Sequence, residues 1–371
     1  MDLIVGTYGQ RMRLLRLGDT SLKLLSFRDI EAENTSSLAL SPDGRFLFAT
    51  IECGDNSGVC SFGIAAKDRM NPLRNPVALL SEIRGTSPDP CHLLYLPGYY
   101  NQCGDPDNGA LLTADYSGGS VSLFPVQGGR IQPAVQVVRF EGSGPDPERQ
   151  LSAHIHHLVL YGNFLLAVDL GSDCIHVLRM FDGTVRPLCD NRLDRSLRLE
   201  HLFDIPAPAG SGPRHLVVDK GGSHCYVLTE LSNELLVYSL PDFTSPEDRA
   251  VLQQRLPVGD ASFPEQAGGD LQLSPDGRHL YASLRNGGDG LVLAELQPDG
   301  TLRRIGYQLT GAHVRDFLFL PGDRMVVCCK NSHCVQFYHR NPADGRLTLL
   351  REIPFAVEDG EPVFPQVLIQ E

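Results

Sequence analysis

Polar side chains that can do chemistry recur at the ends of short apolar runs in this sequence. Histidines and arginines begin such runs, at His92, His154, His156, Arg214, His215 and Arg315. Carboxylates, a tyrosine and further cations follow them, at Glu52, Asp115, Tyr116, Asp169, Asp173, Glu230, Arg285 and Lys330. A histidine or a carboxylate can activate water near neutral pH, and arginines can stabilise an oxyanion or bind an anionic group. The pattern therefore indicates a polar site with acid–base and anion-binding capacity.

Each of these residues also has a structural interpretation. A single histidine at the start of a strand is more often a hydrogen-bonded structural group, and Glu52 or Asp169 can bind backbone amides in a turn. Arg214 and Glu230 can form an ion pair between adjacent strands. The recurrence of both charge signs at equivalent positions favours function, because charge in a confined space is costly unless it is paired or used.

A metal centre is not predicted. His154 and His156, together with Asp169, are of the right ligand types, but alternate residues of a strand share a site only if both face it. No GxSxG elbow, P-loop or HExxH motif occurs in the sequence, which argues against serine hydrolases of that class, NTPases and zincins. We expect no cofactor.

A turn built on Pro-Asp-Gly, or on a relative of it, recurs along the chain. The clearest copies are SSLALSPDGRFLFATIE at 36–52 and GGDLQLSPDGRHLYASLRN at 268–286. The turn glycines are Gly44, Gly98, Gly162, Gly222, Gly277 and Gly322, at intervals of 45 to 64 residues. Proline presets φ in such a turn and glycine supplies the positive φ. Four apolar, β-rich runs per repeat are typical of a propeller blade.

The two chain ends are predicted to complete the ring. Residues 2–28 read as three strands that lack a first partner, and PVFPQVLIQ at 362–370 can supply it. Pairing the ends removes exposed strand edges. We therefore predict an all-β, seven-bladed β-propeller of four-stranded antiparallel blades, forming one domain over residues 1–371. The Gly/Pro/Asp-rich connection 141–152 reads as a surface loop, and the absence of tryptophan argues against the WD-repeat class.

Composition narrows the functional classes further. The 371 residues include 32 basic and 45 acidic side chains, a net charge of −13 that disfavours nucleic acid as a partner. No apolar run approaches the ~20 residues needed to span a bilayer, and the N-terminus does not resemble a secretory signal. The ten cysteines include no CxxC pair and read as reduced thiols packed as small apolar side chains. We expect a cytoplasmic protein with no membrane partner.

Motifs along almost the whole chain resemble one protein family. In order, they are GTYG, SPDGRFLFA–x–x–E, PCHL, A–x–Y–SGGSVSLFPV, RQ–x–x–AH–x–H, VDLG–x–D, G–x–GPRHL, TELSNELLVY and LSPDGRHLYAS–x–R. This series is similar to that of the lactonase family of seven-bladed propellers. The family includes bacterial propeller-type 6-phosphogluconolactonases and fungal carboxy-cis,cis-muconate cyclases.

The resemblance implies roles for individual residues. The family's channel histidine lies in the stretch AHIHH and matches His156 better than His154. Its two arginines match Arg214 and Arg285, and its glutamate matches Glu230. On this basis His156 or Glu230 is the general base for water, with the other orienting it. The two arginines bind the carbonyl oxygen and the anionic group of the substrate.

Further residues are expected around these four. The substrate-binding candidates are His92, Glu52, His154, Asp169, His215 and Arg315. Two positions depart from the family pattern, because Ile51 precedes Glu52 and Asp115 precedes Tyr116 where the family usually has Asn. These departures bear on the identity of the substrate rather than on activity.

The expected function is hydrolysis of an anionic small-molecule lactone. The resemblance points to 6-phosphogluconolactone of the pentose phosphate pathway, hydrolysed to 6-phosphogluconate. The alternatives are a carboxymuconate lactonising or cyclase-type enzyme of aromatic catabolism and a non-catalytic interaction module. A scaffold has no reason to retain two arginines and a glutamate in its channel. A monomer or weak homodimer is expected.

Overall fold

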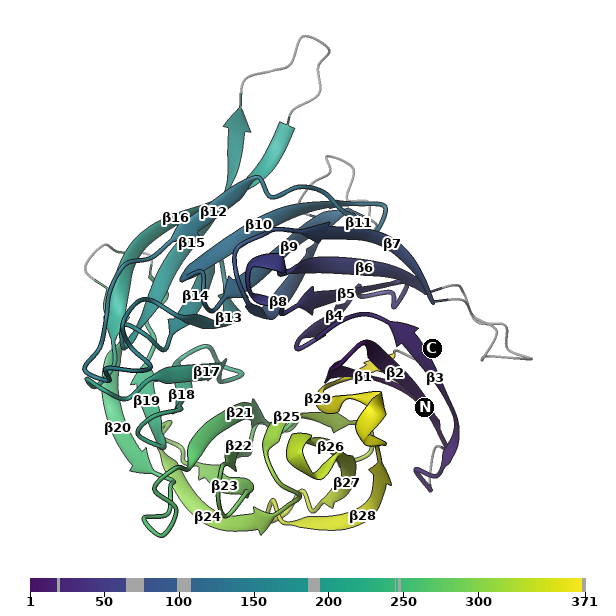
Figure 1. Ribbon diagram of the computed structural model, residues 1–371. Coiled ribbons are helices and arrows are strands. Elements are labelled where there is room, and N and C mark those ends of the chain that lie inside the picture. Colours follow the sequence, from purple (N-terminus) through teal and green to yellow (C-terminus); the bar gives the residue numbers. More distant parts are fainter. Residues whose placement is uncertain are drawn as a thin grey trace.

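Seven antiparallel sheets surround a central axis in the computed structural model of the protein, and form the blades of a propeller (Figure 1). The structure describes residues 1–18, 21–64, 77–98, 108–185, 194–243, 245 and 248–368. Six blades have four strands. Blade 3 has five, because both β11 and β12 pair with β10. The predicted seven-bladed propeller is confirmed.

The blades follow one another in sequence order, counterclockwise from the chain ends in Figure 1, and blade 1 combines strands from both ends of the chain. Blade 1 contains β29 (Glu361–Leu368), β1 (Asp2–Tyr8), β2 (Arg11–Leu17) and β3 (Leu24–Glu31). Blade 2 contains β4 (Leu38–Leu40), β5 (Phe46–Ile51), β6 (Gly58–Ile64) and β7 (Val77–Arg84). Blade 3 contains β8 (Pro90–Pro97), β9 (Gly109–Asp115), β10 (Ser120–Gln127), β11 (Arg130–Ile131) and β12 (Gln136–Arg139).

The remaining blades are each built from four consecutive strands. Blade 4 contains β13 (Ile155–Tyr161), β14 (Phe164–Asp169), β15 (Cys174–Val185) and β16 (Asp194–Pro206). Blade 5 contains β17 (Pro213–Val218), β18 (His224–Thr229), β19 (Glu234–Ser239) and β20 (Val251–Pro257). Blade 6 contains β21 (Ala267–Leu273), β22 (His279–Arg285), β23 (Gly290–Leu296) and β24 (Leu302–Leu309). Blade 7 contains β25 (Val314–Leu320), β26 (Arg324–Cys329), β27 (Cys334–Arg340) and β28 (Leu347–Pro354).

The described helices are single 3₁₀ turns, namely η1 (Gly54–Asn56), η3 (Lys330–Ser332) and η4 (Val357–Asp359). None of the helices in the described part of the chain has the length and apolar character that crossing a bilayer requires.

The chain ends close the ring as predicted. β29 pairs antiparallel with β1, with Asp2 opposite Leu368 and Tyr8 opposite Glu361, and the two strands lie beside one another in Figure 1. The repeated turn also has the predicted backbone. All six turn glycines adopt a positive φ, between 58° at Gly162 and 80° at Gly98. These turns join the innermost strand of a blade to the second one.

The core consists of seven buried apolar clusters, each lying between two adjacent blades. Leu112 of blade 3, for example, shares a cluster with Leu165 of blade 4. Each sheet is therefore buried on both faces by its neighbours. All eight cysteines in the described ranges are free, and seven are buried, as expected for thiols packed as apolar side chains. Cys103 and Cys189 lie outside the described residues.

Candidate active site

One extra residue interrupts the pairing of most innermost strands near the same end of the propeller. The extra residues are Cys91 in β8, His156 in β13, Arg214 in β17, Arg315 in β25 and Val363 in β29. A bulge of this kind puts two residues opposite one and redirects the extra side chain. All five bulged residues line one small central cavity. The bulges therefore gather side chains from separate blades.

Glu230 is the centre of a buried cluster of charges. Its Oε2 accepts hydrogen bonds from Arg214 Nε at 2.8 Å and from Arg285 Nη2 at 2.7 Å. Its Oε1 accepts a hydrogen bond from Arg149 Nη2 at 2.8 Å. The exposed fractions of Glu230, Arg214 and Arg285 are 5%, 1% and 6%. The structure thus brings together the predicted glutamate and both predicted arginines.

Two glycines of β21 fix the two arginines. Arg214 Nη1 donates to the carbonyl oxygen of Gly269 at 2.7 Å, and Arg285 Nε donates to that of Gly268 at 3.2 Å. A Cβ on Gly268 would lie 2.4 Å from the carbonyl oxygen of Thr229, and one on Gly269 would lie 2.3 Å from Ser283 Oγ. Only glycine allows β21 to approach its neighbours so closely at these positions.

The charges in this cluster determine the protonation states of Glu230 and Arg214. Burial alone would raise the pKa of Glu230, but Arg285, Arg214 and Arg149 outweigh burial and hold this pKa well below its usual range. Burial, with Arg285 and Arg315 nearby, lowers the pKa of Arg214 to about 9. At pH 7 Glu230 is therefore an anion and Arg214 a cation. A carboxylate bound by three arginines is a weak base.

His156 is buried in the cavity wall and carries no charge near pH 7. Burial, followed by the charge of Arg214, holds its pKa well below 6.5. Its Nδ1 has no hydrogen-bond partner among the described residues. Its ring lies 5.7 Å from that of Tyr116 and 5.4 Å from that of His215, measured between ring centroids. A neutral imidazole with a free nitrogen can accept a proton from water.

Histidines and the carboxyl group of Asp270 lie close to the buried Arg214. His215 Nδ1 lies 2.8 Å from Asp270 Oδ1, and the rings of His157 and His215 stack at 4.3 Å. His92 accepts a hydrogen bond from the backbone amide of Leu158 at 3.3 Å. Burial raises the pKa of Asp270 to about 6. His92 and His215 therefore line the cavity, but their hydrogen bonds are to the protein.

A second charged group lies across the channel. Arg315 Nη2 donates to the Tyr8 hydroxyl at 3.0 Å, and that hydroxyl donates to Glu52 Oε2 at 2.9 Å. Lys330 Nζ lies 5.5 Å from the centre of the Tyr8 ring and 3.1 Å from Glu361 Oε2. Predicted residues Glu52 and Arg315 thus belong to one hydrogen-bonded chain.

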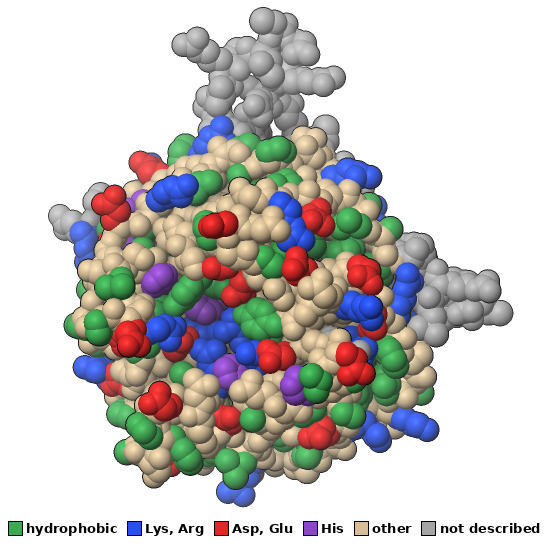
Figure 2. All heavy atoms as spheres, in the orientation of Figure 1, with side chains coloured by type: hydrophobic (Ala, Val, Ile, Leu, Met, Phe, Trp, Pro, Cys, Tyr) green, Lys and Arg blue, Asp and Glu red, His purple; other side chains and the backbone are tan. Residues whose placement is uncertain are grey.

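Positive charge dominates the centre of an otherwise acidic protein. Lys, Arg and His side chains gather in the central hollow of the face shown in Figure 2. The cations that contact Glu230 or Tyr8 are Arg149, Arg214, Arg285, Arg315 and Lys330. A local excess of cations attracts an anionic ligand despite the net charge of the chain.

Two predicted substrate-binding residues lie apart from the Glu230 cluster. Asp169 Oδ1 accepts hydrogen bonds from the amides of His154 and Gly171, and its Oδ2 lies 3.1 Å from His176 Nε2. His154 stacks on Tyr116 at 4.5 Å, and its Nδ1 contacts the carbonyl oxygen of Tyr116. Asp169 thus holds a turn, and of the pair His154 and His156 it is His156 that lines the cavity.

No functional role was predicted from the sequence for Arg149 or Tyr8. Arg149 lies in the connection 141–152, which reads as a surface loop, yet it binds Glu230 and the Tyr116 hydroxyl. Its side chain is 41% exposed, so it lies at the rim of the cluster. The motifs RQ–x–x–AH–x–H and GTYG contain Arg149 and Tyr8. Their position in these motifs is the sequence feature that could have identified them as site residues.

Comparisons with known proteins agree with this fold and identify the family. Residues 2–364 match the family model described as Lactonase, 7-bladed beta-propeller. A 6-phosphogluconolactonase of Bacillus subtilis is 30% identical over 340 residues, which are 90% of this chain and 88% of the relative. A solved structure of a candidate 6-phosphogluconolactonase from Bacteroides fragilis is 30% identical, with a TM-score of 0.81 over 98% of this chain and 97% of that one. A periplasmic gluconolactonase of Pseudomonas aeruginosa is 26% identical, with a TM-score of 0.81 over 99% of each chain.

Proposed function

The chain belongs to the lactonase family of seven-bladed β-propellers, and we propose that it hydrolyses 6-phosphogluconolactone to 6-phosphogluconate. The observation that carries this proposal is the cluster of Arg149, Arg214 and Arg285 around Glu230, with neutral His156 lining the same small cavity as Arg214. The names of the relatives from Bacillus subtilis and Bacteroides fragilis support the same substrate.

In the proposed reaction His156 is the general base. It accepts a proton from water while the water oxygen attacks the lactone carbonyl carbon. Arg214 and Arg285 donate hydrogen bonds to the carbonyl oxygen as it becomes negative, a contribution of ~3–4 kcal/mol per donor in other acyl-transfer sites. The ring C–O bond then breaks, and the leaving ring oxygen takes the proton back from His156. The products are the free acid and the restored imidazole.

Glu230 has a positioning role in this scheme. Arginines hold the pKa of Glu230 low, and both of its oxygens already accept hydrogen bonds from arginines, which makes it a weak base. It holds Arg214 and Arg285 next to each other, because both guanidinium groups donate to its Oε2. Preorganised donors of this kind lower the barrier without reorganising during the reaction.

An anionic substrate also prepares the base. Burial holds the pKa of His156 down most, and the positive charge of Arg214 and of other nearby arginines lowers it further. A bound phosphate offsets that charge and raises the pKa of His156 towards its ordinary value. Proton transfer to His156 is then easier in the complex than in the free enzyme. This coupling favours phosphorylated over neutral lactones.

Arg149 is the proposed contact for the phosphate, because it is the most exposed arginine of the cluster and lies at its rim. Arg149→Ala should lower kcat/KM for 6-phosphogluconolactone by about 10- to 100-fold, the value of one charge-assisted hydrogen bond. The same variant should change kcat/KM for glucono-1,5-lactone, which lacks the phosphate, much less. Steady-state rates with both lactones, corrected for spontaneous opening, give this comparison.

The matched control is Arg303→Ala, which removes an exposed arginine that pairs with Glu295 on the outer strands of blade 6. It should change neither rate. An equal loss on both lactones in Arg149→Ala would contradict phosphate recognition and show that Arg149 acts through Glu230. Faster turnover of the neutral lactone by the wild type would instead favour the activity named for the Pseudomonas aeruginosa relative.

A further inference from the structure

Two histidines and an aspartate of blade 4 face one another outside the candidate active site. His176 Nδ1 lies 2.6 Å from Asp204 Oδ1, and His201 Nε2 lies 2.7 Å from the same oxygen. The ligand-type atoms of these three residues all lie within 4.8 Å of one another. Both imidazole nitrogens thus converge on one carboxylate oxygen. Two histidines and one carboxylate are a typical donor set for Zn²⁺.

The strand geometry explains how His201 and Asp204 come to face the same side. Residues three apart on a regular strand point to opposite faces. Here Val177 pairs with Phe203 and Leu178 pairs with His201, so that Leu202 is an extra, bulged residue. The extra residue shifts the alternation by one position, so that His201 lies on the same face of the sheet as Asp204. Asp204 is the residue paired with His176 on the neighbouring strand.

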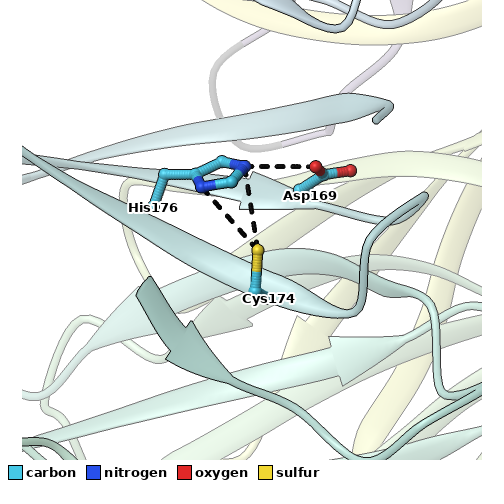
Figure 3. Close-up of side chains that lie close together, drawn as sticks. All are labelled: Asp169, Cys174 and His176. Atoms are coloured by element: carbon cyan, nitrogen blue, oxygen red, sulfur yellow. Dashed lines mark hydrogen bonds and ion pairs between the residues drawn. The ribbon is translucent and has the colours of Figure 1, made fainter. Parts of the chain in front are cut away.

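A second shell of hydrogen bonds fixes His176. Its Nε2 lies 3.1 Å from Asp169 Oδ2 (Figure 3), and Ser172 Oγ donates to the same oxygen at 2.5 Å. The ring of Phe140 stacks on His176 at 3.9 Å. Histidine ligands of metals are usually oriented by a carboxylate on their other nitrogen, and this is the arrangement observed here.

Cys174 does not belong to the donor set. Its Sγ lies 3.7 Å from both ring nitrogens of His176, so it sits against the ring face, as Figure 3 shows. The nitrogen lone pairs lie in the ring plane and point elsewhere. The side chains of His201 and Asp204 are 38% and 47% exposed, so an ion can enter from solvent and a water molecule can complete a tetrahedron.

We propose that His176 Nδ1, His201 Nε2 and Asp204 form a site for one Zn²⁺ ion, with Asp169 as the outer-shell partner of His176. On binding, the protons between the two ring nitrogens and Asp204 pass to water, and the nitrogen lone pairs bind the ion. The site is separate from the proposed lactone chemistry, which requires no metal. It places a structural cross-link between β15 and β16.

Titration of the chelator-treated full chain with ZnCl₂ by isothermal calorimetry tests the proposal. One ion per chain should bind to the wild type. Loss of an outer-shell partner typically weakens metal binding by about 10- to 100-fold, and His201→Ala, which removes a direct ligand, should weaken it more. His224→Ala is the matched control, because His224 is a partly buried histidine that also pairs with an aspartate, Asp219, but lies in blade 5. It should leave binding unchanged.

Two results would overturn the site. One is the absence of stoichiometric binding to the wild type, and the other is equal affinity in wild type and His201→Ala. The absorption spectrum of the Co²⁺-substituted protein checks the ligands independently. An intense sulfur-to-cobalt charge-transfer band would place Cys174 among them and contradict the proposed donor set. These readouts measure binding, so they are independent of lactone hydrolysis.

Discussion

Replacing Glu230 by Gln is expected to lower the free energy of unfolding by about 3–5 kcal/mol, the usual cost of breaking a buried ion pair. Glu230 is the shared counter-charge of Arg214 and Arg285, which are almost fully buried. The amide keeps the shape of the side chain but leaves two guanidinium groups buried without a carboxylate. Urea unfolding at pH 7, followed by circular dichroism, measures the difference.

The effect should also depend on pH with a definite sign. Because arginines depress the pKa of Glu230 in the folded protein, its contribution is complete above the ordinary pKa of 4.5 and is lost as the pH falls through the folded-state value. The difference in unfolding free energy between the wild type and Glu230→Gln should therefore be constant from neutral pH to about pH 5 and decrease below about pH 4.

The matched control for this prediction is Glu295→Gln. Glu295 pairs with one arginine, Arg303, at the exposed surface of blade 6, and such solvent-exposed pairs contribute little to stability. Equal losses of stability in the two variants would show that the Glu230 cluster contributes no more than a surface pair. A variant too unstable to purify at pH 7 would itself agree with the expected direction, provided that Glu295→Gln is folded.

His156→Gln should lower kcat/KM for 6-phosphogluconolactone by about 10²- to 10⁴-fold, the range for removing a general base. The fold should be retained, because His156 is neutral near pH 7 and its Nδ1 has no partner in the described structure. Glutamine fills part of the same space and is too weak a base to accept the proton. Steady-state kinetics and a circular dichroism spectrum measure the two properties.

His339→Gln is the control for this variant, since His339 is exposed on the outer part of blade 7. Its kinetics should equal those of the wild type. A folded His156→Gln protein with wild-type turnover would contradict the assignment of the base. The role would then pass to another group of the cavity wall, and Glu230 would have to be reconsidered despite its low pKa.

Much of the fold could be predicted because its signals are local. Each Pro-Asp-Gly type of turn needs a glycine with positive φ, and Gly44 and Gly277 have it. Counting these turns gave six blades, and the unpaired strands at the two ends left one arrangement, which the pairing of Asp2 with Leu368 confirms. Local turn chemistry and edge pairing were sufficient for the architecture.

The details of the site depended on features that no short stretch of sequence shows. The bulges at His156, Arg214 and Arg315 break the alternation of strand residues, and a bulge is a property of two strands together. Sequence alternation therefore left open which of His154 and His156 faces the cavity. For the same reason, Arg149 could not be assigned from its Gly/Pro/Asp-rich connection.

Asp169 shows the opposite limitation. Asp169 is the last residue of β14 and Glu230 directly follows β18, so the repeat placed both among the candidate site residues. The structure instead pairs Asp169 with His176 and with backbone amides. The strand register explains the difference. Asp169 pairs with Ile155 as Thr229 pairs with Pro213, so Asp169 lies one position before that of Glu230. Successive strand residues point to opposite faces, and one position therefore changes what a side chain meets.

The most direct test of the account is the opening of freshly generated 6-phosphogluconolactone, followed by proton release above the spontaneous rate. The wild type should accelerate it equally with and without EDTA, and Arg285→Ala should lose about 10²- to 10³-fold of kcat/KM, as expected for an oxyanion donor, while keeping its fold. No acceleration by the wild type, or wild-type turnover by folded Arg285→Ala, would contradict the proposed lactonase site.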